Sequence, residues 1–196
     1  MKPRVLYSEA NYPVIVRNKG YFVDKTEYVA RLEKIANPVF LRPRRFGKTL
    51  LCSILRHYYD LNCADEFEEL FSHTWIGQHP TGNQNSCMIL SLNFSLIELG
   101  KDISKIEENF RHYCNIMLAS LGNQYKKLLG DMPKIDMDSP VTENLIGLLQ
   151  YIYEHRLPPL YIIIDEYDNF ANQLVISHQG QLYRELTADN GFMKTF

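Results

Sequence analysis

The stretch Phe40–Thr49 (Phe-Leu-Arg-Pro-Arg-Arg-Phe-Gly-Lys-Thr) constrains the fold of this chain more than any other. The apolar residues Val39–Leu41 predict a short strand, and Gly47 precedes a predicted helix that begins at Lys48. The end of this stretch matches the phosphate-loop pattern G-x-x-x-x-G-K-[ST], in which backbone N–H groups and a helix N-terminus face phosphates. In such a loop Lys48 would reach the terminal phosphates and the hydroxyl of Thr49 would ligate Mg²⁺.

Arg42 departs from this pattern, which has glycine at that position so that the backbone can turn tightly and approach the phosphate. Pro43 is expected to compensate in part by fixing φ near the loop entrance. Arg44 and Arg45 add positive charge where an anion would sit. Gly-Lys-Thr alone is a common tripeptide, so the competing interpretation is a solvated lysine followed by an ordinary helix-capping threonine.

A second stretch, Tyr161–Ile164 followed by Asp165 and Glu166, strengthens the phosphate-loop interpretation. Four consecutive apolar residues predict a buried parallel strand, and open α/β sheets bind ligands at the carboxyl ends of such strands. There Asp165 would hold Mg²⁺ through its water shell, and Glu166 would orient or deprotonate an attacking water. The competing interpretation, a polar strand end meeting solvent, leaves the combination with Gly47-Lys48-Thr49 unexplained. Asp168 is a weaker candidate, because it could simply cap the next segment.

The segments LRPRRFGKTL, GYFVDKTEYV and YIIIDEYD resemble the AAA-ATPase-like family of bacterial P-loop proteins, over about residues 7–196. Members of that family carry arginine at the position of Arg42. The resemblance implies ATP and Mg²⁺ as cofactors, a catalytic role for Lys48 and Glu166, and metal binding by Thr49 and Asp165. It also implies a nucleotide-binding segment, the Walker A motif, made of Arg42, Pro43, Arg44, Arg45, Phe46, Gly47, Lys48, Thr49 and Leu50.

Two functions therefore compete. The first is an ATP-binding module that hydrolyses ATP with Mg²⁺, and the second is a nucleotide-regulated switch or interaction module with little or no turnover. Similar proteins often continue into a nuclease-like domain, but nuclease carboxylates with suitable spacing are not seen in this chain. A protein partner or self-association is compatible with either function.

The composition of the chain limits which classes of protein it can belong to. The 196 residues suit one domain, expected as an extended lead-in over residues 1–20 and a P-loop domain over 21–196. The net charge of −2 gives no global field that would favour nucleic acid. The four cysteines and six histidines show no zinc-ligand spacing. Since no signal segment or membrane-length apolar run is predicted, a cytoplasmic location is expected.

Strands that alternate with helices predict a parallel α/β sheet flanked by helices. Asp24 and Glu27 are expected to cap one helix, and Ser104 and Glu107 another that continues through Leu121. The other expected elements are a helix from Lys48 to about Leu61, a strand over Cys87–Phe94, a helix from Ser139-Pro140 to about His155, and a helix around Gln181–Leu186.

The strand between the phosphate loop and the acidic strand, together with Glu166 beside Asp165, is similar to the additional-strand (AAA/STAND-like) branch of P-loop NTPases. In that branch a strand carrying a polar sensor residue follows the acidic strand. The sequence after Asn169 predicts no such strand. The expectation is therefore a P-loop domain that is truncated at its C-terminal side and leaves a hydrophobic sheet edge exposed.

Overall fold

The computed structural model describes residues 4–43, 45–98, 100 and 102–167, with the side chain of Ile103 excepted. The chain divides into two compact units, Met1–Met88 and Ile89–Phe196. Each unit is described by itself below. The fold is mixed α/β and contains a small parallel sheet of two strands among helices, which confirms the predicted class. The predicted helix around residues 181–186 lies outside the described residues.

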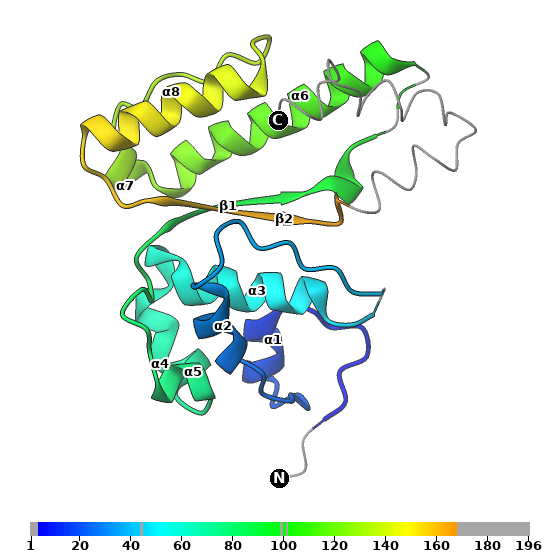
Figure 1. Ribbon diagram of the computed structural model, residues 1–196, viewed down its shortest axis with the longest axis vertical. Helices are drawn as coiled ribbons and strands as arrows, with labels where there is room; N and C mark the ends of the chain where they lie inside the picture. Colours follow the sequence, from blue (N-terminus) through cyan, green and yellow to red (C-terminus); the bar gives the residue numbers. More distant parts are fainter. Residues whose placement is uncertain (1–3, 44, 99, 101, 168–196) are drawn as a thin grey trace. The chain divides into compact units, whose positions relative to one another are not determined.

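The N-terminal unit is built from short helices around one longer amphipathic helix, α3 (Figure 1). Helix α3 (Lys48–Tyr59) buries Ile54, Leu55 and Tyr58, as the apolar spacing predicts. The other helical elements of this unit are α1 (Tyr12–Arg17), α2 (Glu27–Leu32), the 3-10 helix η1 (Leu61–Glu66), α4 (Phe67–Phe71) and α5 (Trp75–Gln78).

Residues 1–20 are not extended throughout, in contrast to the prediction, because Tyr12–Arg17 form α1. The side chain of Asn11 caps this helix by accepting from the backbone N–H of Val14, and Pro13 lies in its first turn. Asn11 and Pro13 are the sequence features that could have predicted this helix. Tyr12 is fully buried, and its hydroxyl donates to the carbonyl of Leu70 at 2.7 Å. The burial of Tyr12 gives this short helix a tertiary anchor that its own length could not supply.

Asp24 does not cap α2, whose N-cap is Thr26. The Asp24 carboxylate instead accepts from the backbone N–H of Thr26 at 2.8 Å and from that of Trp75 at 2.7 Å. The hydroxyl of Thr26 accepts from the N–H of Ile76 at 3.0 Å. The segment before α2 thus supplies acceptors for the first turn of α5, about fifty residues away, and favours the structural interpretation of Asp24 over a role in ligand binding.

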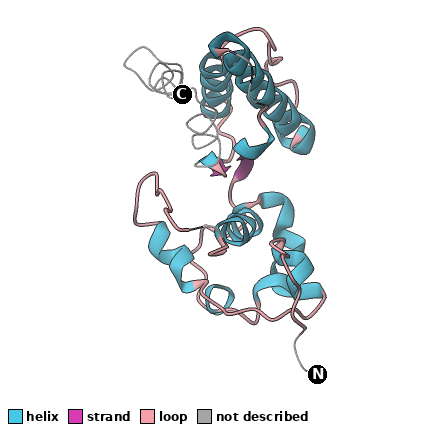
Figure 2. Cartoon of the chain, turned by 90° about the vertical axis from the view of Figure 1, so that its right-hand side faces the viewer, coloured by secondary structure: helices cyan, strands magenta, loops and turns pink. Residues whose placement is uncertain are grey.

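The C-terminal unit has two strands with helices packed on them. Strand β1 (Met88–Asn93) pairs with β2 (Leu160–Asp165), so both predicted strands form to within one residue at each end. The predicted burial of β2 is wrong in part, because Ile162 and Ile164 are 39% and 40% exposed and the buried face carries Ile163. The helices α6 (Ile103–Gln124) and α8 (Val141–Glu154) lie side by side on one side of this sheet (Figures 1 and 2). The 3-10 helix η2 (Phe94–Leu96) and the short helix α7 (Lys126–Leu129) complete the unit.

The core of this unit follows the predicted apolar face of α6, which includes the buried residues Ile106, Phe110, Cys114, Leu118 and Leu121. The predicted caps are shifted. Helix α6 is capped by Asp102, whose carboxylate accepts from the N–H of Lys105 at 2.9 Å, rather than by the Ser104–Glu107 box. Helix α8 has Pro140 at its N-cap, so the helix expected from Ser139-Pro140 begins at Val141. Both shifts leave the buried face of the helix unchanged.

A buried amide holds the connection between α7 and α8. The Asn115 side chain, 0% exposed, donates to the carbonyls of Asp136 and Ser139 at 3.3 and 3.0 Å. Its oxygen accepts from the Asn144 side chain at 3.0 Å, and Asn144 also donates to the carbonyl of Asp136 at 2.7 Å. These bonds pair polar groups that would be costly to bury alone, and they fix an irregular loop to α6 and α8.

One predicted element did not form. Val39–Leu41 is not a strand in the described structure, and Val39 and Leu41 are 70% and 66% exposed. A strand needs partners for its backbone hydrogen bonds, and within the described residues this segment pairs with none. Among the described residues, no helix is long and apolar enough to cross a membrane.

Candidate functional site

The predicted phosphate loop ends in a left-handed glycine. Gly47 has φ of +79° and is the N-cap of α3, whose first residue is Lys48. A Cβ added at Gly47 would meet no atom within 4 Å, so the glycine is required by its backbone conformation and not by crowding. The same geometry leaves open space beside the start of α3. An approaching group can therefore reach the backbone there.

The start of α3 has the electrostatics of an anion site. The helix's own hydrogen-bond ladder cannot use the N–H groups of its first turn, and the helix dipole places partial positive charge there. The N-cap residue, Gly47, has no side chain that could cap this end, and the first turn contains no acidic residue. Lys48 is half-buried and Thr49 is exposed. The residues present therefore fit a phosphate group, which backbone N–H groups and the lysine would bind together.

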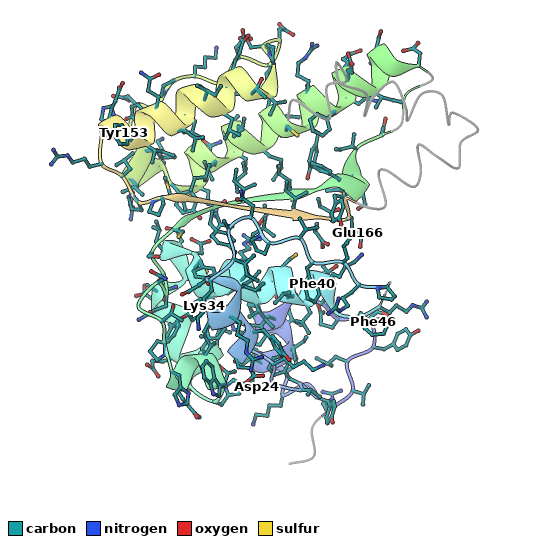
Figure 3. All side chains as sticks on the ribbon, viewed as in Figure 1. Asp24, Lys34, Phe40, Phe46, Tyr153 and Glu166 are labelled. Carbon is teal, nitrogen blue, oxygen red and sulfur yellow. The ribbon has the colours of Figure 1, made fainter. Side chains whose placement is uncertain are left out.

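The loop before α3 carries further cationic groups and a strained backbone. Arg45 has φ of +66°, a conformation that costs a non-glycine residue free energy and that is found preferentially at functional sites. Pro43 and Phe46 are exposed, Phe46 at 67% (Figure 3), and Leu50 is half-buried in the first turn of α3. Arg44 lies outside the described residues.

Arg42, at the position of the missing glycine, is turned back onto its own neighbours. Its guanidinium lies 5.0 Å from the centre of the Phe40 ring, and Nη1 donates to the carbonyl of Leu41 at 2.7 Å. These contacts hold the side chain along the segment Phe40–Leu41.

Helix α3 is fixed one turn beyond the loop by the N-terminal helix. The hydroxyl oxygen of Ser53 accepts from the backbone N–H of Tyr12 at 2.9 Å. Since Ser53 is four residues beyond Thr49, this bond anchors α3 close to the candidate phosphate end. No local sequence pattern indicates this support, because the two residues are 41 positions apart.

The acidic pair lies at the carboxyl end of β2, as predicted (Figure 3). Ile163 anchors the strand at 7% exposure, whereas Asp165 and Glu166 are both half-buried. Oδ1 of Asp165 accepts from the backbone N–H of Glu166 at 2.9 Å, and Glu166 has φ of +58°. A carboxylate offers about four lone-pair positions, so Asp165 keeps acceptor capacity for a metal-bound water. Asp168 lies outside the described residues.

The predicted site residues thus belong to two groups. One group, Arg42 to Leu50, precedes and begins α3 in the N-terminal unit, and the other, Asp165 and Glu166, ends β2 in the C-terminal unit. Within each group the predicted residues are neighbours in sequence. The hydroxyl of Thr49 in one group and the carboxylate of Asp165 in the other are each hard oxygen donors of the kind that Mg²⁺ prefers.

The other reactive groups that the structure describes do not form a competing centre. Burial raises the pKa of the Cys63 thiol to about 11 and that of Cys114 to about 12, which suppresses the nucleophilic thiolate. Burial lowers the pKa of His57, whose Nδ1 lies 2.7 Å from the carbonyl of Ser53. Within the described residues, no group of three or more His, Cys, Asp or Glu side chains is placed to hold a metal ion.

The comparisons with known proteins agree with the geometry of the loop and the acidic strand. A family model described as "Predicted AAA-ATPase" matches residues 7–196, nearly the whole chain. Neither a curated protein nor a solved structure matches the chain. The matching family implies a P-loop fold and suggests nucleotide binding or hydrolysis.

Proposed function

The chain belongs to the predicted AAA-ATPase family, and we propose that it binds ATP with Mg²⁺ at the start of α3 and hydrolyses it. The observation that carries this proposal is the N-terminus of α3. There Gly47 has a left-handed backbone with open space beside it, and Lys48 and Thr49 follow directly. No acidic residue lies in the first turn of α3. This arrangement supplies backbone donors, a cation and a hydroxyl within three consecutive residues.

In this proposal each residue has one role. Lys48 neutralises charge on the terminal phosphates. The other residues of the loop, which are Arg42 to Gly47 and Leu50, surround the phosphate chain. The hydroxyl of Thr49 and the carboxylate of Asp165 hold Mg²⁺, which neutralises charge developing on the phosphates. Glu166 orients the attacking water and accepts its proton. Catalysis would then depend mainly on positioning and electrostatics.

We also propose that the domain belongs to the additional-strand branch of P-loop NTPases. Two observations support this assignment. The strand β1 lies between the phosphate loop and β2 in sequence and pairs with β2, and Glu166 directly follows Asp165 at the strand end. An adjacent glutamate suits a family in which a carboxylate activates water.

A specific observation favours the second candidate function, a nucleotide-regulated switch with little turnover. The segment Val39–Leu41 is not paired as a strand in the described structure, and Arg42 is held against Phe40 and the Leu41 carbonyl. A bound nucleotide that drew Arg42 away would change the conformation of this segment. Such a change would convert nucleotide binding into a structural signal without requiring hydrolysis.

Calorimetric titration with ATP and Mg²⁺, combined with measured phosphate release, tests both candidates. We expect the wild-type protein to bind, and Lys48→Ala to weaken binding by about tenfold or more, since one phosphate-paired cation contributes more than 1.4 kcal/mol. Lys126→Ala is the matched control, because Lys126 is also the first residue of a helix, α7, in the other unit. Circular dichroism establishes that all variants are folded.

Glu166→Gln separates hydrolysis from switching. If ATP is hydrolysed, this variant should bind ATP as the wild type does and release phosphate about 10²-fold or more slowly. Binding without phosphate release by the wild type would support the switch. Equal binding by Lys48→Ala and the wild type would remove α3 as the phosphate site.

A further inference from the structure

Helix α8 has apolar residues on two faces. Its inner face buries Val141, Leu148 and Ile152. Its outer face, defined here as Ile146, Leu149 and Tyr153, is 63%, 43% and 85% exposed. The spacing i, i+3, i+7 aligns these three residues in a stripe along the helix. Burying a large apolar side chain is favourable, so exposing three together forgoes stabilisation.

The neighbouring helix α6 shows that such a stripe is not general in this unit. Nine of the described side chains of α6 are exposed, and Ile116 is the one large apolar residue among them. Six residues of α8 are exposed, and three of these are large and apolar. A helix face of this composition is typical of an interaction surface.

The charges at the two ends of the stripe identify what it would pair with. Glu143 is exposed in the first turn of α8, and Arg156 is exposed just beyond its C-terminus. When two copies of α8 pack antiparallel about a twofold axis between positions 149 and 150, Ile146 faces Tyr153 of the second copy. Glu143 then lies near the C-terminal end of the second copy of α8, which Arg156 follows with φ of +51°. The stripe is therefore self-complementary in both apolar contact and charge.

A parallel pairing of the same helices lacks this complementarity. It would place Glu143 against Glu143 and Arg156 against Arg156, and like charges would repel. Antiparallel packing also sets the helix dipoles in opposite directions. The remaining polar residues of the outer side, Gln150 and Glu154, are hydrogen bonded to each other within the helix at 2.8 Å, which satisfies one acceptor of Glu154.

We propose that the outer face of α8 is a self-association surface that packs antiparallel against α8 of a second copy of this chain. Three apolar residues per copy make a small interface, so association is expected with a dissociation constant on the order of micromolar. The proposal concerns a surface remote in sequence from the loop Arg42–Leu50 and does not depend on nucleotide binding.

Sedimentation equilibrium over concentrations that bracket the micromolar range tests the proposal on the full chain. We expect a reversible monomer–dimer equilibrium for the wild type and an at least tenfold weaker association for Leu149→Lys, which places two ammonium groups near the twofold axis. Ile116→Lys is the matched control. Leu149 and Ile116 are 43% and 44% exposed, so both substitutions should be equally compatible with folding, and Ile116→Lys should associate like the wild type.

A charge exchange tests the antiparallel register. Glu143→Arg alone should weaken dimerisation, because two arginines then face each other, and the double variant Glu143→Arg/Arg156→Glu should restore it. Unchanged ATP binding in these variants would show that self-association and nucleotide binding are separate properties. A wild type that remains monomeric, a Leu149→Lys variant that associates normally, or a double variant that fails to recover would each overturn the proposal.

Discussion

Two apolar segments that precede candidate site residues differ in structure in this protein. Tyr161–Ile164 forms the body of β2, pairs with β1, and buries Ile163 to 7% exposure. Val39–Leu41 has a similar composition but is not a strand, and Val39 remains 70% exposed. Both lead into a turn that contains a left-handed residue other than glycine, Arg45 in one case and Glu166 in the other.

The difference shows that an apolar sequence is necessary for a strand but not sufficient. β2 has a hydrogen-bonding partner, and helices cover one side of the sheet that it forms (Figure 1). The Val39–Leu41 segment has no strand partner within the described residues. The acidic residues at the end of β2 are consequently held by a sheet, whereas the phosphate loop is held mainly by helix α3, which contacts Tyr12.

The largest expected effect comes from truncating an apolar side chain in each segment. Ile163→Ala should lower the free energy of unfolding by about 2–5 kcal/mol, because it removes a buried side chain. Val39→Ala, at an exposed position, should change it by less than about 0.5 kcal/mol. Urea titration of both variants measures the difference. Equal costs would show that Val39 is buried in solution, and a cost for Val39→Ala that appears only with ATP and Mg²⁺ would indicate that nucleotide orders the segment.

A smaller effect concerns the polar contacts that join helices in the N-terminal unit. Although burial opposes the shift, hydrogen bonds from the N–H groups of Thr26 and Trp75 lower the pKa of Asp24 below its ordinary value of 3.8. Because the folded-state pKa lies below the unfolded-state pKa, the stabilisation by Asp24 is present above pH 3.8 and is lost as the pH falls through the folded-state pKa.

Asp24→Ala should therefore cost about 1 kcal/mol at neutral pH, as for the loss of a helix cap, and this cost should shrink in acid. Thermal unfolding from neutral pH to pH 3 measures it. Asp65→Ala, at an exposed aspartate of the same unit, is the control. A difference between Asp24→Ala and the wild type that stays constant down to pH 3 would contradict the assigned role of the carboxylate.

The smallest expected effect compares the two left-handed residues directly. Glycine tolerates φ near +60° without the cost of about 1–2 kcal/mol that other residues incur. Its greater freedom in the unfolded chain lowers the free energy of unfolding by about 0.4–1 kcal/mol, which offsets part of this gain. Arg45→Gly and Glu166→Gly should each raise the free energy of unfolding by up to about 1 kcal/mol. The alanine variants at the same positions keep the Cβ and should show no such gain. Chemical denaturation that ranks alanine above glycine at either position would show that its backbone is not strained.

The sequence by itself was sufficient for elements whose pattern is local. The helical spacing of Ile54, Leu55 and Tyr58 predicted α3, and the uninterrupted apolar run predicted β2 with Asp165 and Glu166 at its end. Gly47 was predicted as the loop residue before α3, and the structure shows it there with φ of +79°. These features depend on neighbours within a few residues, so the periodicity of the sequence carries them.

Only the tertiary structure decided the features that depend on distant partners. The bond from Trp75 to Asp24 spans 51 positions and that from Tyr12 to Ser53 spans 41, and neither has a local signature. The conformation of Val39–Leu41, which is not a strand in the described structure, also depends on distant partners. Its residues favour a strand, but a strand forms only when another segment satisfies its backbone N–H and C=O groups, and that condition is set by the packing of the whole chain.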